Sequence, residues 1–177
     1  LPLFTRDGDF LTTNLKNVGL GVVTADCLPI IAIDSTRSAI GIAHAGWRGS
    51  ATNIANTLIK TMIQEYGSDP SNLIIQLGPC ASQCCYEVQP SFIENLKDTG
   101  VYPALIGTLG EKTHRINDHG NFYFDLPEFN RHLLIAAGVN SKNIDLQAQE
   151  CTICTQGYIS IRRKETTLRQ LTVVSLK

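Results

Sequence analysis

The chain has 177 residues, 43% of them hydrophobic, and a formal net charge of −1. A single sizeable core fits this length, because domains of roughly 100–200 residues are the norm. Acidic and basic residues are interspersed and no apolar run approaches the roughly 20 residues that span a bilayer, which disfavours nucleic-acid and membrane partners. We therefore expect one domain, residues 1–177, whose ligand is a small neutral or anionic molecule. Six cysteines in a chain long enough to fold without disulfides favour reduced thiols and a cytoplasmic location.

Three short apolar runs come first along the chain. They are rich in β-branched residues, and runs of about 4–8 such residues predict buried strands. They cover residues 18–24, 29–34 and 38–44. Ser35-Thr36-Arg37 forms a hairpin-like break between the second and third runs, so we expect these two strands to be neighbours.

A helix is predicted next. Ser50 is a suitable N-cap, and apolar residues then recur at helical spacing until Gly67. The recurring residues are Ile54, Leu58, Ile59 and Ile63. We expect a single helix that begins at Ser50 and ends at Gly67.

Strands and helices alternate over the rest of the chain, which predicts an α+β fold. The expected strands cover residues 73–77, 121–126, 144–149, 157–161 and 170–176. The expected helices run from Pro90 to about Asp98 and from Pro127 to a stop at Gly138.

Polar residues gather at two predicted strand ends. Cys27 lies in Thr24-Ala25-Asp26-Cys27-Leu28-Pro29, and His44 lies in Ala43-His44-Ala45-Gly46-Trp47-Arg48. A thiol and an imidazole on neighbouring strands can bind zinc or act as nucleophile and base. Taken singly, each is more often a core or hydrogen-bonded residue, so the residues alone leave these interpretations open.

Gly46 and Gly49 bracket Trp47-Arg48 where the third strand gives way to the helix. Free N–H groups at a helix start attract anions, and a guanidinium binds phosphate or carboxylate at two points. We therefore expect a phosphate or oxyanion site beside His44. The alternatives are a surface ion pair for Arg48, and core packing as readily as substrate stacking for Trp47.

Three motifs resemble the bacterial YfiH-like family, also described as polyphenol-oxidase-like or laccase-domain purine nucleoside phosphorylases. They are TADCLPI at 24–30, HAGWRG at 44–49 and CCYEV at 84–88. GDFLTT at 8–13 and ECTICT at 150–155 also fall in family order, so the resemblance covers most of the chain. It implies a single α+β domain with mixed β-sheets flanked by helices.

The resemblance also implies a metal held by three ligands, usually zinc, with copper as the alternative. Two ligands fall on Cys27 and His44. The third is expected to be the His of a Gln-Val-His-Gly segment upstream of GDFLTT, which these 177 residues do not contain. We therefore expect an N-terminal segment of the domain to be missing and two ligands to hold the metal weakly.

Similar proteins phosphorolyse adenosine, inosine, guanosine and methylthioadenosine, and deaminate adenosine. The implied partners are a purine nucleoside and phosphate. Beside the catalytic ligands Cys27 and His44, we expect Asp26 or Glu87 as the acid or base, although Asp26 is also a typical turn cap. Arg48 with Gly46 and Gly49 is expected to hold phosphate. Copper-dependent phenol oxidation is disfavoured, because one such site is not the set of copper centres that oxygen reduction needs.

Two other function classes remain open. One is a thiol hydrolase, with Cys27 as nucleophile and His44 as base, acting on an amide such as a cell-wall precursor peptide. The other is a structural zinc or redox module built from the later cysteines, which are Cys80, Cys84, Cys85, Cys151 and Cys154. Cys-x-x-Cys at 151–154 is a common metal spacing, whereas the Cys80-x₃-Cys84 spacing is looser than that of most zinc half-sites.

Overall fold

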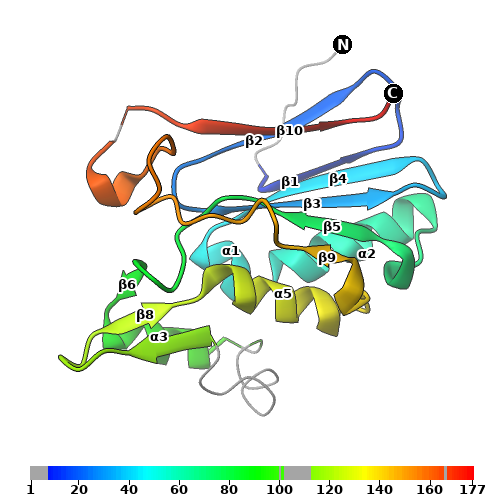
Figure 1. The fold of residues 1–177 in the computed structure, drawn as a ribbon. Coiled ribbons are helices and arrows are strands. Elements are labelled where there is room, and N and C mark those ends of the chain that lie inside the picture. The colour runs from blue at the N-terminus through cyan, green and yellow to red at the C-terminus, as the bar shows by residue number, and fades with distance from the viewer. Residues whose placement is uncertain (1–7, 100, 102–112, 166) are drawn as a thin grey trace.

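A five-stranded mixed sheet forms the centre of the fold in the computed structural model, which describes residues 8–99, 101, 113–165 and 167–177 (Figure 1). The strand order is β1-β4-β3-β5-β9. Only the β5–β9 pair is parallel among these neighbours. The strands are β1 (Phe10–Thr13), β3 (Leu28–Asp34), β4 (Ala39–Ala45), β5 (Ile74–Leu77) and β9 (Ile144–Asp145).

The predicted hairpin between β3 and β4 is confirmed. Asp34 Oδ1 accepts hydrogen bonds from the backbone N–H groups of Thr36 and Arg37, at 2.9 Å each, which closes the turn. At the other end of the hairpin, Leu28 pairs with Ala45 and Pro29 with His44. The start of β3 therefore lies beside the end of β4, at one edge of the sheet.

Three helices lie on one side of this sheet (Figure 1). They are α1 (Trp47–Ala51), α2 (Ile54–Tyr66) and α5 (Leu126–Ala136). Leu58, Ile59 and Met62 of α2 belong to the main core with no exposed surface. A Cβ at Gly41 of β4 would lie 2.8 Å from Leu58 Cδ1, so the glycine allows α2 to approach the sheet closely.

The prediction of one helix beginning at Ser50 is wrong. Helix α1 begins at Trp47, and α2 begins at Ile54 after a break. Asn53 is the N-cap of α2, because its side chain accepts the Asn56 N–H while its backbone adopts φ 63°. Ser50 is instead buried and accepts a hydrogen bond from Asn130 Nδ2 at 2.8 Å. Gly67 ends α2 as predicted, with φ 67°.

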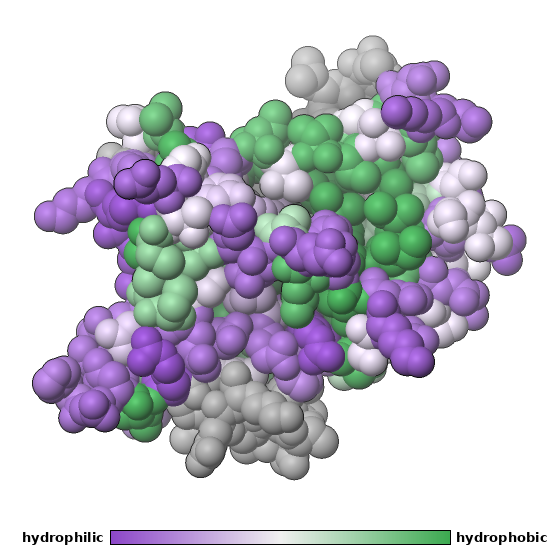
Figure 2. Space-filling view, in the orientation of Figure 1, coloured by the Kyte–Doolittle hydropathy of each residue, from purple (hydrophilic) through white to green (hydrophobic). Residues whose placement is uncertain are grey.

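An antiparallel ribbon of two strands, β2 (Gly19–Thr24) and β10 (Gln170–Ser175), covers part of the opposite side of the sheet. Leu20 of β2 packs with Ile40 and Ile42 of β4 in a second, smaller core. The outer face of the ribbon carries exposed apolar side chains, among them Leu171 and Val173. Figure 2 accordingly shows hydrophobic residues gathered over β10 and the neighbouring strands.

A third sheet, in the order β6-β8-β7, lies apart from the other two, with α3 beside it (Figure 1). Its elements are β6 (Glu87–Val88), β7 (His114–Ile116) and β8 (Phe122–Phe124), and α3 covers Pro90–Lys97. The α+β fold class is confirmed, with one mixed sheet, two antiparallel sheets and flanking helices. No helix in the described part of the chain is long and apolar enough to cross a membrane.

The strand expected at 157–161 is wrong, and the one expected at 144–149 is reduced to Ile144–Asp145. A short 3₁₀ helix covers Ile161–Arg163 instead. The guanidinium of Arg163 donates to the carbonyl oxygens of Thr152 and Ile153, at 2.6 and 2.8 Å. These side-chain bonds fold the segment back on itself and take the place of a strand ladder.

The α2–sheet contact gives a stability prediction. Leu58→Ala should lower the free energy of unfolding by about 2–5 kcal/mol, because it leaves a cavity in the main core. Ile63→Ala, on the exposed side of the same helix, should cost much less. Urea unfolding followed by circular dichroism measures both, and equal losses would contradict the burial of Leu58.

Candidate functional site

A cavity of about 240 Å³ lies at the edge of the sheet where β3 begins and β4 ends. It is lined by Asp9, Cys27, His44, Gly46, Trp47, Arg48 and Gly49. Cys27 directly precedes β3, and His44 is the penultimate residue of β4. The structure therefore brings together the thiol and the imidazole that the sequence singled out, along with the expected Arg48 and both glycines.

Cys27 and His44 point to the same place because of the strand register. Residues directly opposite one another in an antiparallel pair share a face of the sheet, so the His44–Pro29 pairing places Cys27 on the same face as His44. A Cβ built on Gly46 would lie 3.0 Å from Cys27 Sγ and 4.0 Å from His44 Nε2. The missing side chain of Gly46 thus leaves a space that both donor atoms border.

Asp9 orients the imidazole. Its Oδ1 lies 3.2 Å from His44 Nδ1, and its backbone oxygen accepts the His44 N–H at 2.7 Å. With Nδ1 bonded to a carboxylate, Nε2 is left to face the cavity as a ligand or base. Asp9 was not among the predicted site residues, although it is the acidic residue of the GDFLTT motif at 8–13.

The Cys27 thiol is not activated by its own surroundings. Burial raises its pKa, and the nearby carboxylates of Asp26 and Asp9 raise it further. A nucleophilic cysteine needs the opposite shift, toward the thiolate. A bound cation would supply that shift, because metal coordination deprotonates a thiol outright.

Asp26 does not line the cavity, although it precedes Cys27. Its backbone adopts φ 80°, in the left-handed region. Its Oδ1 accepts a hydrogen bond from Thr152 Oγ1 at 2.7 Å, and its Oδ2 accepts the backbone N–H of Arg162 at 3.0 Å. Both carboxylate oxygens therefore connect the β2–β3 turn to the C-terminal segments. Asp26 thus holds a turn, which is the alternative to an acid or base role that its sequence position suggests.

Glu87 lies in a neighbouring cavity of about 260 Å³. That cavity is lined by Trp47, Tyr86, Glu87, Val88, Gln89, Phe92 and Arg162, so Trp47 borders both cavities. The Trp47 and Phe92 rings pack edge to face with centroids 5.2 Å apart. The Arg162 guanidinium lies 4.9 Å from the Tyr86 ring centre. This second cavity is therefore aromatic and has a cation and a carboxylate on its walls.

Arg48 is exposed at the mouth of the first cavity. Its guanidinium carbon lies 4.5 Å from the centre of the Trp47 ring, a cation–π contact that holds the side chain in place. Helix α1 has only five residues, so its dipole adds little to anion binding at Gly46 and Gly49. The expected phosphate site thus depends on the Arg48 side chain.

The donor set suits a soft or borderline cation. Thiolate and neutral imidazole are preferred zinc ligands, and the Asp9–His44 pair is the carboxylate–histidine arrangement that supports metal-bound imidazoles. Within the described residues, no third His, Cys, Asp or Glu joins Cys27 and His44 in a ligand group. The cavity therefore offers two ligands of a metal site.

A family model described as multi-copper polyphenol oxidoreductase laccase matches residues 4–177. The chain belongs to this family. The YfiH-like resemblance is thereby confirmed, and it extends to solved structures of this laccase-like fold. The YfiH protein of Bacillus licheniformis superimposes with a TM-score of 0.83 at 32% identity, over 96% of this chain and 61% of that one.

Curated relatives of this laccase-like chain carry two activity names. An adenosine deaminase, RL5, of an unknown prokaryotic organism is 33% identical over 88% of this chain and 56% of its own length. The purine nucleoside phosphorylase YlmD of Bacillus subtilis is 31% identical over 86% of this chain and 51% of its own length. The chain thus spans about half the length of these two relatives.

Alkylation of Cys27 tests whether a metal ion binds in the space at Gly46. Excess zinc should slow the reaction of Cys27 with iodoacetamide, followed peptide by peptide in a mass spectrometer, because a metal-bound thiolate is shielded. Gly46→Ala should abolish this protection, since its Cβ would occupy the space between the two donors. Gly49→Ala, whose Cβ meets only ordinary contacts of 3.5 Å or more, should retain it. Equal protection in both variants would show that zinc does not lie between Cys27 and His44.

Proposed function

We propose that this protein is a metal-dependent purine nucleoside phosphorylase that also deaminates adenosine. The observation that carries the proposal is the convergence of Cys27 Sγ and His44 Nε2 on one cavity, with Arg48 at its mouth. The activity names of the curated relatives support the same assignment. Each activity needs a polarising centre beside the nucleoside, and only phosphorolysis also needs a bound phosphate.

Cys27 and His44 would hold the metal, with zinc as the first choice and copper as the alternative that the same donors accept. When bound, zinc supplies a Lewis acid that polarises substrate oxygen or nitrogen and lowers the pKa of water to about 7. We do not extend phenol oxidation to this chain, because one Cys-His pair is not the set of copper centres that reduction of oxygen requires.

The aromatic cavity next to the donor pair suits the purine. Trp47 borders both cavities, so a base stacked in the second cavity leaves the sugar directed toward the first. Tyr86 and Phe92 complete the aromatic lining, and planar rings stack on such surfaces. Arg48 would then hold phosphate at the cavity mouth by a two-point, charge-assisted contact.

Glu87 is the better candidate for moving a proton. Its side chain is exposed and borders the proposed purine cavity. Both carboxylate oxygens of Asp26 already accept hydrogen bonds from Thr152 and Arg162. We therefore assign acid–base transfer at the base to Glu87, and the holding of the β2–β3 turn to Asp26.

Replacing Arg48 should separate phosphorolysis from adenosine deamination. In the full-length protein, Arg48→Ala should lower kcat/KM for phosphorolysis by about 100-fold, or about 2.7 kcal/mol, and change adenosine deamination much less. Arg37→Ala, at the far end of the β3–β4 hairpin, is the matched control and should change neither. Nucleoside turnover measured with and without phosphate gives both values.

Equal losses in the two activities would make Arg48 a nucleoside-binding or structural residue and remove the phosphate assignment. Absence of both activities, together with metal-independent hydrolysis of a peptide amide that Cys27→Ala abolishes, would replace the proposal with a thiol hydrolase.

A further inference from the structure

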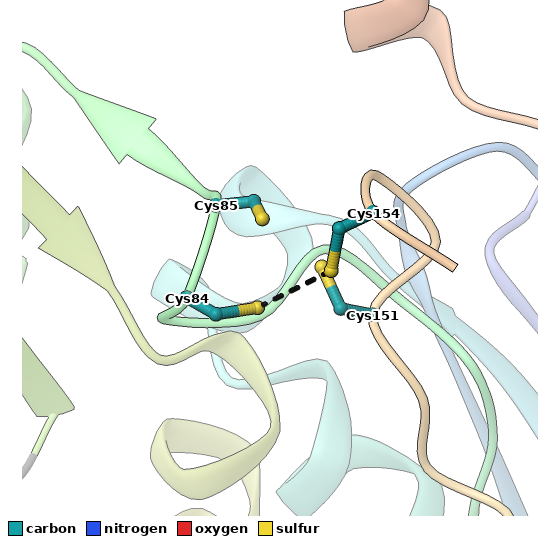
Figure 3. A group of neighbouring side chains, drawn as sticks. All are labelled: Cys84, Cys85, Cys151 and Cys154. Atoms are coloured by element: carbon teal, nitrogen blue, oxygen red, sulfur yellow. Dashed lines mark hydrogen bonds between the residues drawn. The ribbon is translucent and has the colours of Figure 1, made fainter. Parts of the chain in front are cut away.

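Two pairs of cysteines, from segments that are far apart in the sequence, meet in the structure (Figure 3). Cys84 and Cys85 lie in the segment between β5 and β6, and Cys151 and Cys154 lie in the segment after β9. Their Sγ atoms all lie within 4.8 Å of one another. All four are free thiols. None of them lines the cavity that holds Cys27 and His44.

The spacing of the sulfurs matches a tetrahedral metal site. A zinc ion with four Zn–S bonds of about 2.3 Å places its sulfurs about 3.8 Å apart. Cys84 Sγ and Cys154 Sγ are separated by 3.8 Å. A disulfide would need about 2.05 Å. The side chains in Figure 3 point inward toward a common centre from both segments, as ligands of one ion do.

Backbone hydrogen bonds hold the two segments together independently of the sulfurs. Cys80 N–H donates to Glu150 O, and Thr152 N–H donates to Cys80 O, both at 3.0 Å. Each segment also closes its own turn: Cys85 N–H donates to Ser82 O at 2.9 Å, and Thr155 N–H donates to Cys151 O at 3.0 Å. The fold thus places the thiols before any ion arrives, which favours metal affinity.

An arginine side chain hydrogen-bonds to each cysteine-bearing turn. Arg115 donates to the carbonyl oxygens of Gln83 and Cys84, both at 3.2 Å. Arg163 donates to the carbonyl oxygens of Thr152 and Ile153 on the other turn. Four thiolates around a divalent cation leave a net charge of about −2, and nearby cations stabilise such a centre.

We propose that Cys84, Cys85, Cys151 and Cys154 bind one zinc ion in a closed, structural tetrathiolate site. The site would join the β5–β6 segment to the segment after β9. The same two segments hold the turn before Cys27, since Ala81 N–H donates to Asp26 O at 2.8 Å and Thr152 Oγ1 donates to the Asp26 carboxylate. The ion therefore also stabilises the position of Cys27. This site does not depend on the proposed nucleoside chemistry.

Zinc X-ray absorption spectroscopy tests the site directly in the reduced, full-length protein. We expect about one equivalent of zinc whose ligands are four sulfurs at about 2.3 Å. In Cys27→Ser, which removes the thiol of the other proposed zinc site, the zinc that remains should have sulfur ligands only. In Cys84→Ser/Cys154→Ser that equivalent should be lost. Cys80→Ala is the matched control and should keep the zinc. Cys80 lies beside the cluster, but its sulfur contacts Gln149 instead.

The Cys27→Ser spectrum decides the question even if the double variant fails to fold. Absence of a zinc fraction with four sulfur ligands would overturn the proposal, as would zinc that persists unchanged in a folded Cys84→Ser/Cys154→Ser variant. A disulfide between two of the four cysteines in protein purified without oxidant, detected by mass spectrometry, would also overturn it. Removal of the zinc by a chelator should lower the melting temperature by several degrees.

Discussion

The register of the β3–β4 hairpin is the constraint on which the site depends. Because Leu28 pairs with Ala45 and Pro29 with His44, the residue that precedes β3 and the last residues of β4 meet at one edge of the sheet. A slip of one residue would turn His44 to the other face and separate it from Cys27. Asp34 closes the turn at the far end, and the pairing of β1 with β4 brings Asp9 to the imidazole. His44 therefore lies in β4, and Cys27 and Asp9 directly precede β3 and β1, the two strands that pair with β4 in the same sheet.

Asp26 connects this edge to the rest of the molecule. It is a left-handed residue without the freedom of glycine, so its conformation needs support from elsewhere. That support comes from Thr152 and Arg162, which bind its carboxylate, and from Ala81, which binds its carbonyl oxygen. The position of Cys27 thus depends on residues far along the chain, two of which, Thr152 and Arg162, lie 126 and 136 residues after Asp26. A residue that resembles a catalytic acid in sequence has both of its oxygens engaged in holding a turn.

The elements that were predictable are those whose signal is local. The β-branched runs located β2, β3 and β4, and the stop at Gly67 located the end of α2, because period and turn chemistry lie within a few residues. The start of the helix was misplaced because Ser50 and Asn53 are both good caps, and burial against Asn130 takes Ser50 into the core. Cys27 and His44 were identified because they flank adjacent strands. Asp9 was missed because its partner is 35 residues away. The sequence spacing pairs Cys80 with Cys84, whereas in the structure Cys85, and not Cys80, joins Cys84 in the four-cysteine cluster.

The two thiol-containing sites differ in the way that separates catalytic from structural metal centres. Catalytic zinc keeps an open position for water or substrate, and structural zinc is closed by four protein ligands. Cys27 and His44 border a cavity and leave about half of a tetrahedral coordination sphere to other groups, whereas Cys84, Cys85, Cys151 and Cys154 together provide four sulfur ligands. Asp26 lies between the two sites, bonded to Thr152, which follows Cys151, and covalently joined to Cys27. Any loosening of the cysteine cluster would therefore reach the turn before Cys27 through Asp26, although none of the four cysteines lines the cavity.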